Sequence, residues 1–151
     1  QKGFNLTLEA SDGQLESTAN VTINVGAAAN LDIGDNGVLD QSDALLLLGN
    51  TLGQDALTQS FANDANALQP DTVTRTVNEI NQYIKDHGTS LFDLGGNGIV
   101  DQSDALLLLG NTLGQDALTQ SFADDANALQ LGTVSPTVNE INEFIQDHLP
   151  V

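Results

Sequence analysis

The chain has 151 residues, of which 40% are hydrophobic, and its 21 acidic and 3 basic residues give a formal net charge of −18. Such a charge argues against nucleic acid as a partner, because nucleic acid binds to basic patches. No apolar run is long enough to suggest membrane insertion. There is no cysteine, so a disulfide framework is excluded and the fold must be stabilised in another way.

Residues 4–10 and 18–25 alternate apolar and polar side chains, with turn residues between them at 11–14. This alternation predicts a β-hairpin over residues 1–26. The segment resembles the last two strands of a bacterial cadherin-like or immunoglobulin-like sandwich, which implies that it is the remnant of such a domain. Residues 27–31 are expected to be a linker, and the start at Gln1 without a signal-like segment suggests a piece of a longer protein.

The rest of the chain is an internal repeat with a constant offset of 61 residues. Residues 32–87 and 93–148 are identical at 44 of 56 positions. We therefore expect two repeats, 32–90 and 93–151, that fold alike and pack about a pseudo-two-fold axis in one domain over 32–151.

Each repeat opens with twelve residues, 32–43 and 93–104, that have the spacing of an EF-hand calcium loop. Positions 1, 5, 9 and 12 carry Asp or Asn, position 6 is Gly, and position 7 offers its backbone carbonyl. Calcium takes six to eight oxygen ligands at about 2.3–2.6 Å, and this pattern supplies oxygens of the right kind. Two Ca²⁺ ions are expected, with the ligands Asp32, Asn36, Val38, Asp40 and Asp43 in the first loop and Asp93, Asn97, Ile99, Asp101 and Asp104 in the second.

The loops depart from the pattern at position 3, which is glycine in both and offers no side-chain ligand. Asp35 could replace it in the first loop, whereas the second loop has Gly96 there and is expected to bind more weakly. The apolar residues at position 8, Leu39 and Val100, are expected to join the loops through a short β-bridge and to face the core. The alternative interpretation is a pair of Asp- and Gly-rich turns that bind no ion.

A leucine-rich helix follows each loop. In the first repeat, Ser42 or Asp43 is expected to cap it, the leucines 45–48 should be buried on several sides, and the helix should fade at Gly49 and Gly53. A shorter helix is expected from Asp55 through Phe61, with a loop over 63–71.

The third helix of each repeat has the clearest start. Thr76 and Glu79 form a capping box, Gly88 is expected to stop the helix, and Thr137 begins its twin. His87 and His148 lie near the ends of these helices, and we interpret them as structural residues and not as metal ligands.

The loop followed by Asp-Ala-Leu-Leu-Leu-Leu resembles dockerin type I repeats, and residues 32–149 look like the dockerin-like repeats of secreted bacterial proteins. This resemblance implies paired loop-helix calcium sites and an extracellular or bacterial cell-surface location. In dockerins a cohesin on another protein is bound partly through loop positions 10 and 11, which here are Gln41, Ser42, Gln102 and Ser103. At positions 17 and 18, where dockerins often carry basic residues, this chain has Leu and Gly.

The sequence offers no nucleophile–base pairing and no phosphate-binding loop, so we do not expect an enzyme. It predicts a mainly α fold of two tandem EF-hand-like loop-helix repeats with an N-terminal β-hairpin. The predicted function is that of a calcium-stabilised structural and protein-interaction module in a secreted or cell-surface bacterial protein, with a cohesin-like protein or a second copy as possible partner. The alternative is a true dockerin that binds a cohesin on a scaffold protein.

Overall fold

The computed structural model describes residues 2–11, 13–25, 28–52, 62–64, 73–113, 123–125 and 136–150. In chain order its elements are β1 (Lys2–Ser11), β2 (Glu16–Val25), α1 (Gln41–Thr51), α3 (Val77–Leu91), α4 (Gln102–Thr112) and α6 (Val138–Asp147). The chain is therefore mainly helical with an N-terminal two-stranded sheet, as the sequence predicted. None of the helices in these ranges combines the length and the apolarity that crossing a membrane requires.

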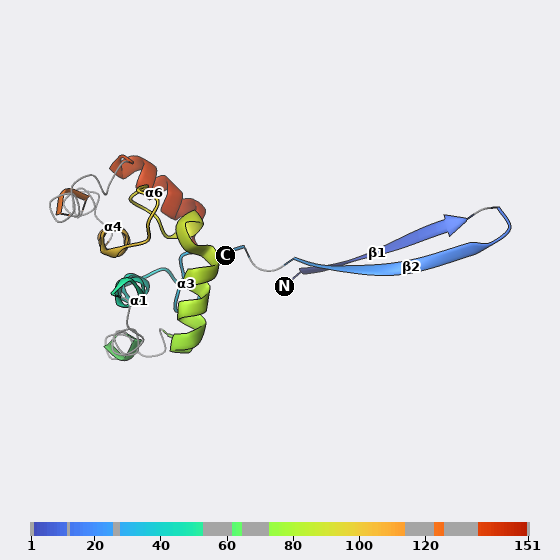
Figure 1. Cartoon of the computed structure of the whole chain (residues 1–151), viewed down its shortest axis with the longest axis horizontal. Helices are drawn as coiled ribbons and strands as arrows, with labels where there is room; N and C mark the ends of the chain where they lie inside the picture. Colours follow the sequence, from blue (N-terminus) through green and yellow to red (C-terminus); the bar gives the residue numbers. More distant parts are fainter. Residues whose placement is uncertain are drawn as a thin grey trace.

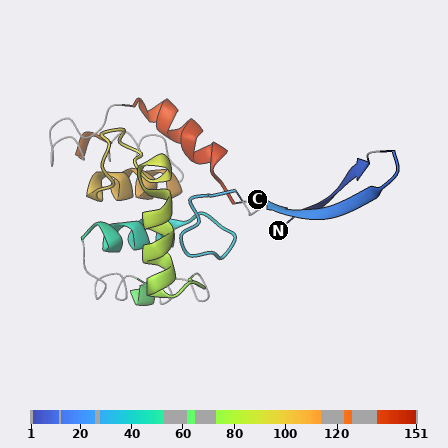
Figure 2. The ribbon, with the colours of Figure 1, turned by 45° about the vertical axis from the view of Figure 1, so that its right-hand side comes forward.

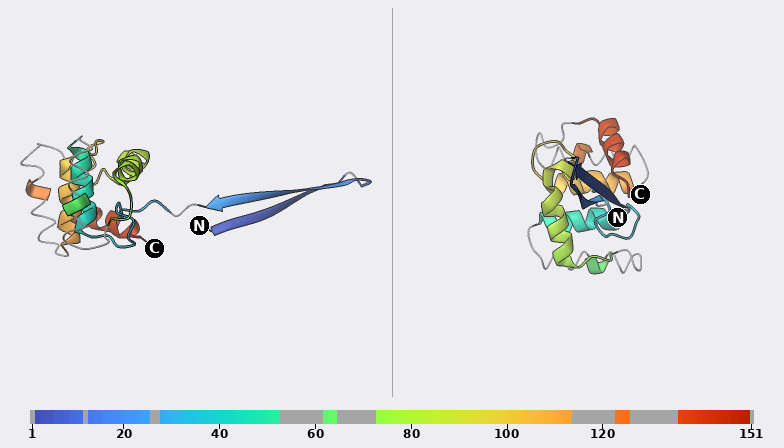
Figure 3. Two further views of the ribbon diagram at one scale, coloured as in Figure 1. Left: turned by 90° about the horizontal axis from the view of Figure 1, so that it is seen from below. Right: turned by 90° about the vertical axis from the view of Figure 1, so that its right-hand side faces the viewer.

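Strands β1 and β2 form an antiparallel hairpin whose register runs from Lys2 opposite Val25 to Ser11 opposite Glu16. Both strands are longer than the alternating pattern indicated. The hairpin extends away from the helices, and among the described elements its strands contact only each other (Figures 1 and 3). Apolar side chains stay partly open to solvent, with Leu6 47% and Leu8 56% exposed.

The core of the helical part forms where α1 packs against α4, and the two helices lie side by side in both views (Figures 1 and 2). Two leucines of each helix are fully buried in a single hydrophobic cluster: Leu46, Leu47, Leu107 and Leu108. The burial expected of leucines 45–48 is confirmed for Leu46 and Leu47, whereas Leu45 and Leu48 are half-buried. At roughly 25 cal/mol per Å² of apolar surface removed from water, burying these side chains stabilises the fold.

The ends of α1 differ from the expectation. Asp40 is the N-cap and accepts from the backbone of Ser42, while Asp43 is the third helical residue and completes a capping box. The helix also runs through Gly49 to Thr51, and Gly49 is buried. Burial in the core outweighs the helix-breaking tendency of a glycine, which is about 1 kcal/mol relative to alanine. Helix α4 repeats this arrangement with Asp101 as N-cap.

Helix α3 begins as predicted, because Thr76 accepts from the backbone of Glu79 and the Glu79 carboxylate accepts from the backbone of Thr76 at 2.8 Å. Gly88 leaves the helical conformation with φ 42°, but a further turn continues to Leu91. This turn carries Leu91 and Phe92 into the core, where they are 3% and 0% exposed. Gly88 therefore kinks the chain and does not end the element.

Three further expectations have different outcomes. The helix predicted from Asp55 to Phe61 lies outside the described residues, and residues 63 and 64 are helical where a loop was expected. Leu39 and Val100 form no β-bridge, so that expectation is wrong, but both pack half-buried against the core as predicted.

The segment before the first loop is fastened to both repeats. The Leu31 amide donates to the His148 carbonyl at 3.0 Å, and the Tyr83 hydroxyl donates to the Asn30 carbonyl at 2.6 Å. Leu31 is fully buried, so the helical core includes a residue that the sequence placed in the linker. These contacts connect the two repeats in addition to the leucine helices.

Replacing Leu47 by Asp is expected to unfold both repeats together, because it places a charge in the contact between α1 and α4. Losing a buried leucine costs about 2–5 kcal/mol, and burial of an unpaired carboxylate adds to this. The methyl signals of Ile141 in the second repeat should lose their dispersion in NMR spectra. Leu15→Asp, at a 75% exposed position of the hairpin, adds the same charge and should leave these signals unchanged. Dispersed second-repeat signals in Leu47→Asp would contradict a shared core.

Candidate metal centre

The first loop curls around the carboxylate of Asp32. Its two oxygens accept from the backbone amides of Asn36 at 3.2 Å and Gly37 at 2.7 Å. Gly37 has φ 85°, a left-handed conformation that side chains rarely adopt, and this is the sharp turn that position 6 requires.

Asp43 closes the same loop from its other end. Its oxygens accept from the backbone amides of Gly34 and Asp40, both at 2.9 Å, and only 1% of the residue is exposed. The side-chain oxygen of Asn36 accepts from the amide of Val38 at 2.9 Å. Because Asp43 belongs to the first turn of α1, the conformation of the loop is coupled to the start of the leucine helix.

The second loop has the same hydrogen bonds. Asp104 accepts from Gly95 at 2.8 Å and from Asp101 at 2.7 Å, and it is fully buried. The bonds of Asp93 to the amides of Asn97 and Gly98 measure 3.0 and 2.7 Å. Two separate stretches of the chain thus adopt one local structure, and the eight identical residues among their twelve account for it.

Burial raises the pKa of Asp43 from 3.8 to about 7, although hydrogen bonds from Asp40 and Gly34 act in the opposite direction. The negative charges of Asp32 and Asp40 raise it further. In the second loop burial likewise raises the pKa of Asp104 to about 7, with Asp101 and Asp93 contributing. In each loop the charges of two further aspartates thus act on the buried carboxylate.

In the described part of the chain no basic side chain pairs with Asp43 or Asp104, and the salt bridge present joins Arg75 to Asp35. Buried charges in proteins are paired or hold metal ions, and a carboxyl with a raised pKa can also be neutralised by a proton. In the described ranges, however, no three His, Cys, Asp or Glu side chains come together as a metal cluster. The carboxylates of the loops accept hydrogen bonds from backbone amides instead. That the ten predicted ligands hold calcium stays a prediction.

The other predicted site residues are placed clearly. Val38 and Ile99 are 55% and 62% exposed, which fits residues that would act through their backbone carbonyls. At the predicted partner-binding positions Gln41 and Gln102 are exposed. The neighbouring Ser42 and Ser103 are 6% and 7% exposed and donate their hydroxyls to Asp40 and Asp101.

Arg75 is a site residue that the sequence reasoning missed. Its Nη1 atom donates to the carbonyls of Asp32 and Ile33, each at 2.8 Å, and its Nη2 atom lies 3.2 Å from the Asp35 carboxylate. Its guanidinium carbon lies 4.0 Å from the centre of the Tyr83 ring. A signal was present in the sequence, because Arg75 and Asp35 occur together in one repeat and are replaced together by Pro136 and Gly96 in the other.

The ion pair also changes the interpretation of Asp35. Its side chain is 62% exposed and lies 3.2 Å from Arg75, so Asp35 would have to leave this ion pair to act as a spare calcium ligand. The weaker binding expected of the second loop stays a prediction.

The two histidines have the structural role that the sequence suggested. The Nδ1 atoms of His87 and His148 lie 2.8 and 2.7 Å from the carbonyls of Tyr83 and Phe144, and each ring packs on the aromatic ring of that residue.

No protein-family model, curated protein or solved structure matches this chain. The geometry of the loops is therefore the basis for a functional proposal.

The metal-free protein should lose stability as the pH rises from about 4 to 7. Asp43 and Asp104 have folded pKa values of about 7 against an ordinary value of 3.8 for an aspartate, so the folded state binds more protons in this window. Stability must then fall with rising pH and level off above about 7, by roughly 4 kcal/mol for each of the two groups. Thermal unfolding in EGTA between pH 5 and 8 measures this.

A double variant, Asp43→Asn with Asp104→Asn, removes the two titrating groups and should flatten this pH profile. Asp125→Asn with Asp147→Asn removes the same charge from exposed positions and should leave the profile steep. Equal pH profiles of the two double variants would show that the buried carboxylates do not cause the loss.

Arg75→Ala is expected to lower the free energy of unfolding by about 2 kcal/mol, because two carbonyls lose a charged donor and Tyr83 loses its cation. Lys85→Ala removes the same charge from an exposed position of α3 and should cost less than about 0.5 kcal/mol. Denaturant unfolding compares the two variants. Similar losses of unfolding free energy would show that the contacts of Arg75 do not stabilise the fold.

Proposed function

We propose that this chain is a calcium-binding, calcium-stabilised structural and protein-interaction module of a secreted or cell-surface bacterial protein. The observation that carries the proposal is the burial of Asp43 and Asp104, each beside two further aspartates and without a basic partner in the described residues. A bound divalent cation would supply the missing positive charge.

Calcium suits these loops better than other common ions. The available donors are carboxylate, amide and backbone carbonyl oxygens, which hard cations prefer, and the chain has no cysteine for a softer metal. The ion in the first loop would be held by Asp32, Asn36, Asp40, Asp43 and the carbonyl of Val38. The second loop would use Asp93, Asn97, Asp101, Asp104 and the carbonyl of Ile99. An affinity of about 10⁻⁴–10⁻³ M, as in extracellular modules, is expected for three carboxylates per loop.

The packing supports a structural role for the ions. Asp43 and Asp104 lie in the first turns of α1 and α4, and these helices form the centre of the core. We propose that the two units are EF-hand-like loop-helix repeats related by a pseudo-two-fold axis. An ion in either loop would then stabilise the shared core through the helix that the loop begins.

Calcium should raise the melting temperature of the protein. An ion that binds only the folded state stabilises it by about 2.7 kcal/mol per site at a hundredfold excess over Kd. In Asp43→Asn with Asp104→Asn more than half of the calcium-induced rise should disappear, because the position-12 carboxylates are lost. Calorimetric melting in EGTA and in millimolar calcium measures the effect.

The surface variant Asp125→Asn with Asp147→Asn is the matched control for that experiment and should keep the full rise. A melting temperature that calcium does not change would contradict the proposal. A rise of equal size in both double variants would mean that calcium acts on the general acidic surface.

Gln41 and Gln102 are exposed, so docking onto a cohesin is a second candidate function. A pulldown with a cohesin in calcium and in EGTA tests it. Calcium-dependent capture that Gln41→Ala with Gln102→Ala abolishes would support a true dockerin, whereas a structural module would show the stability effect without capture.

A further inference from the structure

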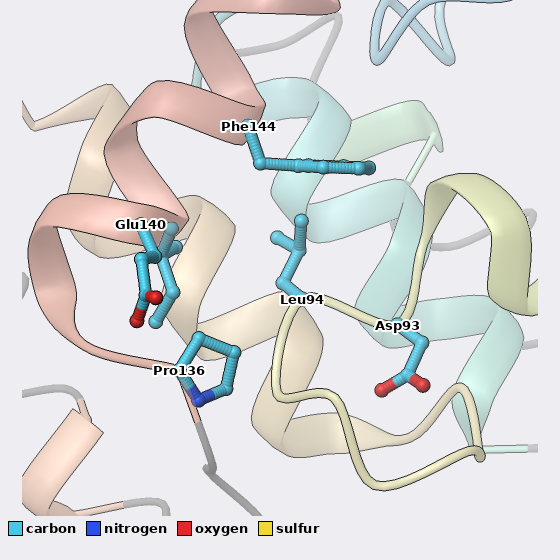
Figure 4. A pocket seen from close by; sticks show the side chains of 6 residues that line it. Asp93, Leu94, Pro136, Glu140 and Phe144 are labelled. Atoms are coloured by element: carbon cyan, nitrogen blue, oxygen red, sulfur yellow. The ribbon is translucent and has the colours of Figure 1, made fainter.

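The second repeat contains a pocket of about 430 Å³ between its calcium-type loop and helix α6 (Figure 4). Phe144 and Leu94 lie one above the other in the view, Pro136 and Glu140 lie across from them, and the Asp93 carboxylate points into its own loop. The pocket is lined by Asp93, Leu94, Pro136, Glu140, Ile141 and Phe144.

The first repeat shows what this pocket is shaped to hold. With the offset of 61 residues, the position of Pro136 is occupied by Arg75, and Phe144 corresponds to Tyr83. The guanidinium of Arg75 donates to the carbonyls of Asp32 and Ile33, which correspond to Asp93 and Leu94, and it stacks on the Tyr83 ring. An arginine side chain thus fills the equivalent place in the first repeat.

The second repeat keeps the groups that receive this guanidinium and lacks the arginine. Pro136 has a short ring without a donor, so it cannot reach the carbonyls of Asp93 and Leu94. The Asp93 carbonyl accepts one long bond, 3.4 Å, from the Gly96 amide, and a carbonyl oxygen has a second lone pair. The aromatic face is retained, since Phe and Tyr both attract cations.

We propose that this pocket binds an arginine side chain of a partner protein, which takes the place that Arg75 takes in the first repeat. Arg75 is the only arginine among the 151 residues and is already engaged, so the arginine must come from outside them. The net charge of −18 favours a cationic partner.

Charge within the pocket supports this choice. In the first repeat hydrogen bonds from Thr76 lower the pKa of Glu79, and the charge of Arg75 contributes. Glu140 is the equivalent of Glu79 and lines the second pocket. The carboxylate of Asp35 has no counterpart, because Gly96 stands there, so the arginine bound from outside has one ionic contact fewer.

The inference goes beyond the proposed calcium role and does not rest on it. An NMR titration of the full chain with N-acetyl-L-arginine N-methylamide, in EGTA and again in calcium, tests it. We expect the signals of Leu94, Gly95 and Phe144 to shift, with millimolar affinity that falls with salt. The citrulline counterpart has the same shape without the charge and should bind at least about tenfold more weakly, since hydrogen bonds to charged groups are stronger.

Pro136→Arg should fill the pocket from within and abolish the probe-induced shifts. Glu140→Gln keeps the capping box of α6 and should weaken binding about two- to fivefold, as expected for an exposed ion pair. Unchanged binding to Pro136→Arg, equal binding of the citrulline probe, or shifts spread over the acidic surface would each overturn the proposal.

Discussion

The structure depends on how the buried carboxylates of Asp43 and Asp104 are tolerated in a chain with three basic residues. Asp32 in the first loop is buried as well. Asp43 and Asp104 are 1% and 0% exposed, and each lies at the start of a leucine helix beside two further aspartates. The backbone amides of Gly34 and Gly95 offset part of the free-energy cost of burying these carboxylates, but hydrogen bonds from neutral donors do not neutralise a charge. A proton or a cation must neutralise the charge that the hydrogen bonds leave, and at neutral pH a bound calcium ion would neutralise it most fully.

The same two residues connect the loops to the core. Asp43 binds the loop backbone with its carboxylate and belongs to the helix that buries Leu46 and Leu47 against α4. Arg75 adds a second connection in the first repeat, because it links the carbonyls of the loop to Tyr83 on α3. The charged loops are therefore physically connected to the packing between the repeats, which is the reason for expecting an ion to stabilise the whole helical part.

Local features were predictable from the sequence, and features that depend on distant residues were not. The capping box of Thr76 and the turn at Gly37 follow from neighbouring residues, so their spacing was sufficient. The sequence pattern places the N-cap two or three residues too late, because Asp40 also fits position 9 of the ligand pattern. The passage of α1 through Gly49 follows from burial against α4, which no local pattern contains. The bond of Arg75 to Asp32 spans 43 residues, and the pocket beside Pro136 becomes visible only when the two repeats are compared in space.

The central claim is that both loops are calcium sites. The most direct measurement is a calcium titration of the ¹⁵N-labelled chain that follows the amide signals of Gly34, Gly37, Gly95 and Gly98. These four amides donate to the carboxylates that would hold the ions, so their environment must change when a cation binds. The account predicts that all four signals move and saturate at two ions per chain. Signals that stay in place up to about 10 mM calcium, well above the Kd of weak extracellular sites, would contradict it.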